Sequence, residues 1–314
     1  MAVEIKQTLE REYEIFLTAQ DIRNLNFAKL AKIFEKDMKN EELTEITGMK
    51  LLIRIEGCAN VFDLLVPKIE GSATCLQYNT HNIGTDLTSI KDITNCLLEH
   101  ILSREQKLPQ NFVLVGYSYG SIIAIELAQK LEEMNLKGRL ILIDGAPEHI
   151  KAMANVICPF TTLDEFQNNV FLGILGLFQS AASEKFVLEL NKCTNTNWDE
   201  KLEIFLKHVS SAYSQVMIDK RKALCTTIYK HLNGLHEYDV TQAPKIESLI
   251  ILLKPTTYSL LFPQEDYGLH KITADKGKIE IHYVEGNHMT IMDNEKVVAA
   301  INETINSIEP IKKL

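Results

Sequence analysis

A serine between two glycines, in residues 116–120 (GYSYG), is the feature of this sequence best suited to covalent chemistry. A serine hydroxyl is a weak nucleophile unless a base can reach it, and the pattern G-x-S-x-G is typical of a sharp turn between a strand and a helix. The flanking sequence meets that condition, because residues 111–115 (NFVLV) form an apolar run and residues 121–130 have helical periodicity. We therefore expect Ser118 at the tip of a strained turn, in front of the positive end of a helix dipole.

An acid and a base follow Ser118 at the ends of two later predicted strands. The apolar run at residues 140–143 ends at Asp144, and the predicted strand 278–284 leads to His288. The carboxyl ends of parallel strands share one edge of a sheet, where ligands bind. In α/β-hydrolases, which have the order serine, acid, histidine, the histidine takes the serine proton and the acid orients and stabilises the imidazole.

Two parts of this predicted site have more than one interpretation. The acid could also be Asp266 or Glu265, because many hydrolases of this fold take it from a later strand. The oxyanion of the reaction would be bound by two backbone N–H groups, one from Tyr119 and one from the turn at Ile55 and Glu56. A plain turn is the alternative interpretation at the second of these places.

Apolar runs alternate with helical patterns over residues 49–314, and this alternation predicts the fold that would position the site. It indicates a mostly parallel sheet with helices on both faces, which is an α/β-hydrolase fold. Residues from about 148 to 240 break the rhythm, because they are helical in pattern and rich in apolar side chains. We interpret them as a helical cap over the active-site rim, suited to a long hydrocarbon ligand. A helical subdomain packed on itself, with no groove, is the alternative.

The residues before the predicted sheet form a separate pattern. Residues 1–36 predict short helices with too little apolar surface to be stable alone, and residues 37–48 are polar and charged, as in a linker. Residues 1–13, continued by residues 18–25, resemble the later half of the acyl carrier protein domain of animal fatty acid synthase. In that family the phosphopantetheine-bearing serine lies immediately before this helix, and no residue here matches it. An ordinary amphipathic cap is the alternative.

Four motifs together resemble the thioesterase domain of animal, type I, fatty acid synthase. They are residues 52–57 (LIRIEG), 116–120 (GYSYG), 143–147 (IDGAP) and 284–288 (VEGNH), and the resemblance runs from about residue 50 to 310. In that family the acid follows the strand after the serine turn, so the resemblance assigns the triad Ser118, Asp144 and His288. Arg54 is a departure, because the family usually has His-Pro where this first strand meets Ile-Glu-Gly.

The resemblance implies hydrolysis of a fatty acyl thioester on an acyl carrier protein, which releases a free fatty acid and ends its synthesis. The expected partner is acyl-phosphopantetheine on a carrier protein, or acyl-CoA, with other fatty acid synthase domains as neighbours. No cofactor or metal is expected. Two other functions stay open: an esterase or lipase acting on free lipid or acyl-CoA, and a non-catalytic interaction protein that has kept the hydrolase fold.

The bulk composition narrows the classes of function. The chain has 46% hydrophobic and 24% charged residues, which is ordinary for a globular protein. Its net charge of −9, with no dense basic stretch, argues against a nucleic-acid surface. The longest apolar stretch, residues 170–178, is far too short to span a membrane. No signal peptide is evident, and the 6 cysteines contain no C-x-x-C pair. We therefore expect a cytoplasmic protein without disulfides.

Overall fold

The structure of the protein is a computed structural model that describes most of the predicted sheet and its helices. The described residues are 49–55, 62, 65–71, 73–78, 89–104, 108, 110–177, 184–193, 197–209, 215–257, 264–275 and 277–303. The helical segment predicted for residues 1–36, the linker predicted for residues 37–48, and Glu56 of the predicted oxyanion turn lie outside them.

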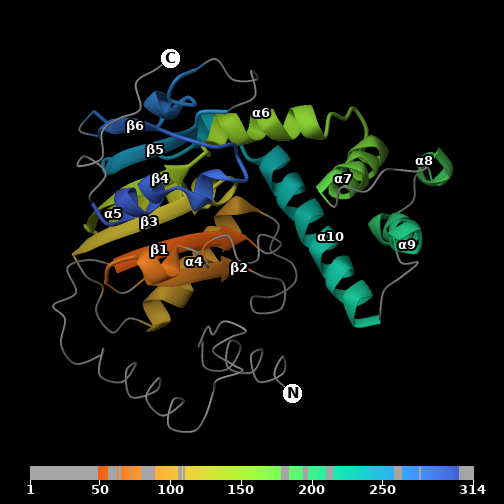
Figure 1. Ribbon diagram of the computed structural model, residues 1–314, viewed down its shortest axis with the longest axis horizontal. Helices are drawn as coiled ribbons and strands as arrows, with labels where there is room; N and C mark the ends of the chain where they lie inside the picture. Colours follow the sequence, from red (N-terminus) through yellow and green to blue (C-terminus); the bar gives the residue numbers. More distant parts are fainter. Residues whose placement is uncertain are drawn as a thin grey trace, which may run out of the picture. The chain divides into compact units, whose positions relative to one another are not determined.

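Six strands form one sheet in the described part of the chain (Figure 1). They are β1 (Met49–Ile55), β2 (Ala73–Tyr78), β3 (Asn111–Tyr117), β4 (Lys137–Ile143), β5 (Leu249–Pro255) and β6 (Ile279–Val284). Their order across the sheet is β2-β1-β3-β4-β5-β6, and every neighbouring pair is parallel. The predicted parallel sheet of an α/β-hydrolase fold is thus confirmed. All six strands end at the same edge, which is where the predicted site residues follow them.

Helices pack on both faces of the sheet because its central strands are apolar on both sides. In β3, Leu114 belongs to the apolar cluster shared with α4 (Ile90–Arg104) and α5 (Gly120–Glu133). Its neighbour Val115 belongs to a second cluster, shared with α11 (Glu295–Ile301). Successive side chains of a strand point to opposite faces, so each strand contributes to both clusters. Short 3₁₀ helices occupy some of the connections: η1 (Val66–Lys68), η2 (Val240–Gln242), η3 (Leu269–Lys271) and η4 (Ile291–Asp293).

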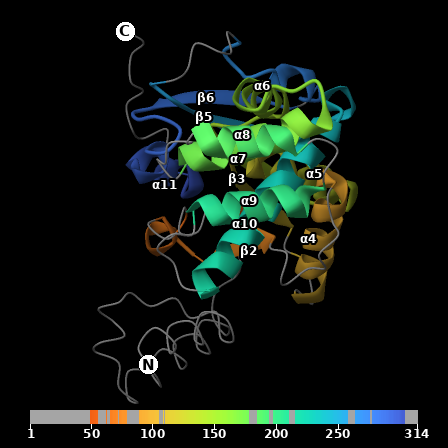
Figure 2. The same ribbon diagram turned by 90° about the vertical axis from the view of Figure 1, so that its right-hand side faces the viewer.

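Five helices lie between β4 and β5 in the described residues. They are α6 (Pro147–Ile157), α7 (Leu163–Leu177), α8 (Glu184–Lys192), α9 (Trp198–Val209) and α10 (Gln215–Glu237). Figures 1 and 2 show α7, α8 and α9 grouped beyond the edge of the sheet, with α6 and α10 connecting this group to the sheet. None of the helices that the structure describes, including the 23-residue α10, is long and apolar enough to cross a membrane.

Candidate active site

Ser118 lies in the turn between β3 and α5, as the motif predicts. Its φ of 54° is in the left-handed region, which residues with a side chain rarely adopt. Two backbone hydrogen bonds hold it there: Ser118 N–H donates to the carbonyl of Ile143 at 3.0 Å, and Ser121 N–H donates to the carbonyl of Ser118 at 3.0 Å. The predicted strand, turn and helix are confirmed, and the backbone strain is located at the expected nucleophile.

The turn is possible because two glycines let three backbone segments approach one another. A Cβ atom at Gly116 would lie 2.6 Å from Ser121 Cα and 2.7 Å from the carbonyl oxygen of Gly120. A Cβ atom at Gly145 would collide with the side chain of Ser121 and the carbonyl oxygen of Ser118. The end of β3, the start of α5 and the residues after β4 therefore meet directly around Ser118.

Asp144 follows β4 and pairs with His288. Its Oδ2 lies 2.7 Å from His288 Nδ1, and its Oδ1 accepts a hydrogen bond of 2.8 Å from the hydroxyl of Tyr267. The residue is 4% exposed, and its backbone has a φ of 45°. Its own N–H donates to the carbonyl of Leu253 at 2.8 Å, which attaches the turn to β5. An ionised carboxylate only accepts hydrogen bonds, so this pairing places a proton on Nδ1 of the imidazole.

His288 lies beside the residue that precedes Ser118. The ring of Tyr117 stacks on the imidazole with centroids 5.1 Å apart, and its hydroxyl donates to the carbonyl of His288 at 2.7 Å. The loop that carries His288 is fixed by Asn287, whose Oδ1 accepts a hydrogen bond from Met289 N–H at 2.9 Å. Because Asp144 occupies Nδ1, the other nitrogen, Nε2, is the one that can take a proton from a nucleophile.

The two alternative acids have other partners. Asp266 accepts hydrogen bonds from the backbone N–H groups of Gly268, at 3.0 Å, and of His270, at 2.9 Å. Burial raises the pKa of Asp266, but these bonds and the His270 ring outweigh burial and lower it. Glu265 Oε1 accepts a hydrogen bond from Tyr283 at 3.2 Å. Asp266 thus stabilises its own turn, whereas Asp144 is the carboxylate that contacts His288.

The predicted oxyanion donors are described only in part. Tyr119 is the N-cap residue of α5, a position next to backbone N–H groups that have no partner within the helix. In the sheet, Ile53 of β1 pairs with Gly116 of β3, so the last residues of β1 run toward the edge of the sheet where Ser118 lies. The role of Ile55 as an oxyanion donor stays a prediction.

Two further residues of the site, His149 and Lys254, carry no signal in the sequence that relates them to Asp144. His149, in the first turn of α6, stacks on the Tyr267 ring with centroids 3.7 Å apart, and its Nε2 is 3.8 Å from Asp144 Oδ1. Lys254 Nζ lies 4.2 Å from the centroid of the same ring. Burial lowers the pKa of His149 to about 4, although the charge of Asp144 acts in the opposite direction. His149 is therefore neutral at pH 7.

Helix α10 and the residue that follows it contact the serine turn and α5 at two points. The ring of Tyr119 stacks on His231 of α10, with centroids 5.1 Å apart. Just after α10, the hydroxyl of Tyr238 donates to Oε1 of Glu126 in α5 at 2.6 Å, and both side chains are buried. Burial lowers the pKa of His231 to about 4, so this contact involves a neutral imidazole at pH 7. One helix of the insertion is thus anchored directly behind the serine turn.

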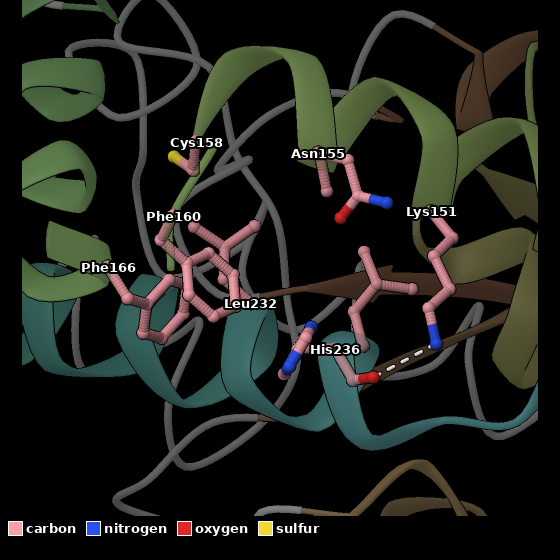
Figure 3. Close-up of a pocket in the computed structure, with 9 residues that line it drawn as sticks. Lys151, Asn155, Cys158, Phe160, Phe166, Leu232 and His236 are labelled. Carbon is pink, nitrogen blue, oxygen red and sulfur yellow. Dashed lines mark hydrogen bonds between the residues drawn. The ribbon is translucent and has the colours of Figure 1, made fainter. Parts of the chain in front are cut away.

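Much of the insertion's apolar surface forms a core of its own. Phe166, Phe171 and Ile174 of α7 are buried in a cluster with residues of α8, α9 and α10. A cavity between α6 and α10 measures about 10 Å³, the space of a single water molecule. Figure 3 shows Phe166 at one end of this cavity and Lys151 at the other, where Lys151 Nζ donates to the carbonyl of His236 at 2.9 Å. An acyl groove beside Ser118 therefore stays a prediction.

No group of histidine, cysteine, aspartate and glutamate side chains within the described ranges is arranged to hold a metal ion. The site instead consists of a strained serine, a histidine, and a buried carboxylate that has a donor on each oxygen. Chemically, this arrangement can take a proton from a serine and stabilise the imidazolium that results. It suits acyl transfer from an ester or a thioester to serine.

Comparison with known proteins points to one family. The sequence profile of the family described as "Thioesterase domain" matches residues 54–308. The type II thioesterase BorB from the borrelidin biosynthetic cluster is 17% identical, with 83% of this chain and 94% of that chain covered and a TM-score of 0.53. The Vlm2 thioesterase domain bound with a dodecadepsipeptide is 14% identical, with 84% and 93% covered and a TM-score of 0.52. At such identities the structural similarity concerns the fold.

Proposed function

The chain belongs to the thioesterase domain family, and from this premise we propose that it hydrolyses fatty acyl thioesters through a covalent intermediate on Ser118. The observation that carries the proposal is the 2.7 Å contact between His288 Nδ1 and Asp144 Oδ2, at the edge of the sheet where Ser118 lies. The contact fixes the orientation and tautomer of the imidazole. Nε2 is then available to accept the proton of the serine hydroxyl.

In the first half of the proposed reaction, Ser118 Oγ attacks the carbonyl carbon of the thioester while His288 Nε2 takes its proton. The carbonyl oxygen becomes an oxyanion, bound by the backbone N–H of Tyr119 and by the turn at Ile55 and Glu56. When this intermediate collapses, the carbon–sulfur bond breaks and the thiol leaves with the proton from His288. The acyl group is then an ester of Ser118.

In the second half, water replaces the thiol and the same groups act again. The oxygen of the water attacks the carbonyl carbon of the acyl ester while His288 takes a proton from that water. The oxyanion forms again at the same backbone donors. Collapse breaks the bond to Ser118 Oγ, which recovers its proton from His288 and releases the fatty acid. In both halves Asp144 stabilises the imidazolium, and its burial at 4% exposure strengthens that interaction.

The resemblance of four sequence motifs to fatty acid synthase supports a fatty acyl chain on phosphopantetheine as the substrate. The same resemblance supports a carrier protein, rather than free lipid, as the proposed partner. The NocB thioesterase domain, which is 15% identical with 85% of this chain and 96% of that chain covered and a TM-score of 0.50, forms a covalent complex with a fluorophosphonate analog. A fluorophosphonate is accordingly the reagent of choice for testing Ser118 as a nucleophile.

The decisive experiment compares the variants Ser118→Ala and Ser103→Ala on a long-chain acyl-CoA. Ser103 is exposed on α4 and bonds only its own helix in the described contacts, so it controls for the loss of a serine hydroxyl. Ser118→Ala should lower kcat by at least about 10³-fold and abolish fluorophosphonate labelling, while Ser103→Ala keeps both. Wild-type turnover by Ser118→Ala would refute the proposal. Faster cleavage of the matching oxygen ester would favour the esterase alternative.

Acyl-CoA substrates of increasing length test the fatty acyl part of the proposal. Each methylene that becomes buried adds up to about 0.8 kcal/mol. Four extra carbons can then add about 3 kcal/mol, or about 200-fold in kcat/KM. We expect kcat/KM to rise with chain length and then level off. A maximum at acetyl would remove the fatty acyl assignment, and a flat profile would favour a cap that is packed on itself.

A further inference from the structure

The carboxylate of Asp144 is held by two donors that come from different parts of the chain. His288 Nδ1 lies 2.7 Å from Oδ2, and the Tyr267 hydroxyl lies 2.8 Å from Oδ1. Rotation of the carboxylate about its Cβ–Cγ bond would break at least one of these contacts. The tyrosine therefore determines the plane of the group that orients His288.

Tyr267 is itself held firmly, although its backbone is unfavourable. It is 3% exposed and has a φ of 55°, a conformation that persists in a non-glycine residue only where the surroundings impose it. His149 stacks on the ring at a centroid distance of 3.7 Å and an interplanar angle of 3°, which leaves no space on that face. Lys254 Nζ, 4.2 Å from the ring centroid, must therefore lie over the opposite face.

The charges around Asp144 explain why a tyrosine suits this position. Among the residues that the structure describes, the titratable groups that face the carboxylate are those of His288, Tyr267 and His149, and Lys254 lies behind the tyrosine ring. His149 is neutral at pH 7, because burial lowers its pKa to about 4. The tyrosine hydroxyl likewise brings no positive charge, so neither group competes with an imidazolium for Asp144. The lysine cation polarises the ring and favours donation by its hydroxyl.

We infer that Tyr267 is a positioning residue for the reaction, which orients Asp144 so that His288 can exchange protons with Ser118. The ring is held for this purpose between His149 and Lys254. Lys254 also anchors the loop that carries the tyrosine, because its Nζ donates to the carbonyl of Glu265 at 2.5 Å. This inference rests on the proposed function, since it concerns the same proton transfer.

The variant Tyr267→Phe tests the inference, because it removes one oxygen atom and keeps the stacked ring. We expect kcat to fall about 10-fold, the effect of losing a hydrogen bond to a charged group, while KM stays within about twofold. Without the tyrosine donor, the charge of Asp144 acts on His288 alone and favours the protonated imidazole. The acid limb of the pH profile of kcat/KM should therefore move to higher pH.

Tyr283→Phe is the matched control. The hydroxyl of Tyr283 bonds Glu265 at 3.2 Å, and its ring lies 5.9 Å from Lys254 Nζ, so the change removes a hydroxyl near the same lysine without touching Asp144. This control should keep the wild-type kcat and pH profile. An equal loss in both variants would assign the effect to the loop as a whole and overturn the inference.

A double-mutant cycle separates positioning from stability. In Asp144→Asn, the pairing with His288 is already disturbed, so adding Tyr267→Phe should lower kcat by less than about twofold further. A structural role would give the full 10-fold loss in either background and would overturn the inference. The rate at which a fluorophosphonate labels Ser118 should also fall in Tyr267→Phe. If the labelling rate, kcat and the acid limb of the pH profile were all unchanged in this variant, the inference would be overturned. Failure of the proposed function can be told apart from failure of this inference, because the proposed function fails only if Ser118→Ala still turns over substrate.

Discussion

Replacing Gly116 with alanine tests whether the close approach of β3 and α5 is what places Ser118. The new Cβ would lie 2.6 Å from Ser121 Cα and 2.7 Å from the carbonyl oxygen of Gly120. Both are backbone atoms, so no side-chain rotation relieves the contact. Ordinary van der Waals contact begins at 3.4 Å, and the strand and the helix must therefore separate by about 0.8 Å, the difference between 3.4 and 2.6 Å.

This separation has two consequences of predictable size. A misplacement of a reacting group by about 1 Å can lower the rate by about 100-fold, so we expect a loss of that order in kcat/KM for Gly116→Ala. Forcing an extra methyl group into a packed interior also destabilises a protein by about 1–3 kcal/mol. For a domain of this size, that change lowers Tm by about 2–4 °C per kcal/mol.

The variant Gly173→Ala provides the matched control. Gly173 lies inside α7, and a Cβ there would have its nearest neighbours at 3.8 Å, which is ordinary contact. Alanine in a helix is about 0.5–1 kcal/mol more favourable than glycine, so this variant should gain stability and keep its rate. Thiol release from acyl-CoA and thermal unfolding measure both quantities. Wild-type turnover and Tm in Gly116→Ala, or equal losses in the two variants, would refute the reasoning.

Two further predictions concern single carboxylates. Asp144→Asn should lower kcat by about 10³–10⁴-fold by disturbing the histidine tautomer, whereas Asp266→Asn should have a mild effect; the opposite ranking in steady-state assays would move the acid to the later loop. Asp164→Ala should destabilise the protein by about 3 kcal/mol in urea unfolding, because Lys201 Nζ, fully buried and 2.7 Å from Asp164 Oδ1, loses its counter-charge. Glu189→Ala, which breaks an exposed pair with Lys185, should leave stability unchanged, and an equal loss there would contradict the argument.

The sheet and the serine turn could be predicted because their signals are local. The central strands are continuous apolar runs, and the turn has a motif whose glycines are required by the backbone. Asp144 and His288 could be placed at one edge because each follows a strand of a parallel sheet. That His288 pairs with Asp144 and not with Asp266 depends on contacts between segments that are far apart in the sequence. Sequence alone therefore left the choice of acid to a family resemblance.

The residues that surround Asp144 had no comparable signal. His149 lies close to Asp144 in the sequence, but no motif relates the two; the first turn of α6 brings His149 Nε2 to 3.8 Å from Asp144 Oδ1. Tyr267 reaches the same carboxylate from a loop after β5, through a backbone conformation that no sequence pattern specifies. Lys254 lies in β5 among apolar neighbours, and no sequence pattern relates it to Asp144. Long-range packing determined all three positions.

The insertion illustrates a different limit of sequence patterns. An apolar stripe on a helix has the same periodicity whether it lines a ligand groove or packs on other helices. Phe171 was among the residues expected to suit a hydrocarbon ligand, but its ring stacks on Trp198 at 4.4 Å and on Phe205 at 5.0 Å. Deciding between groove and core required the positions of α8 and α9. For the described residues of α7, packing against α8, α9 and α10 explains the apolar periodicity.

The distribution of backbone strain connects Tyr267 to the site by an independent argument. Within the described residues, five non-glycine residues have positive φ, and two of them, Asn135 and Glu303, directly follow the C-caps of α5 and α11, where this conformation is ordinary. The other three are Ser118, Asp144 and Tyr267, with φ of 54°, 45° and 55°. Each such residue costs about 1–3 kcal/mol, so three together consume a large share of a typical domain's stability. Strain of that size persists where packing and hydrogen bonds impose it, and a direct contact joins the tyrosine to the acid. The unfavourable backbone thus occurs at the proposed nucleophile, at the acid that stabilises the imidazolium, and at the tyrosine that orients the acid.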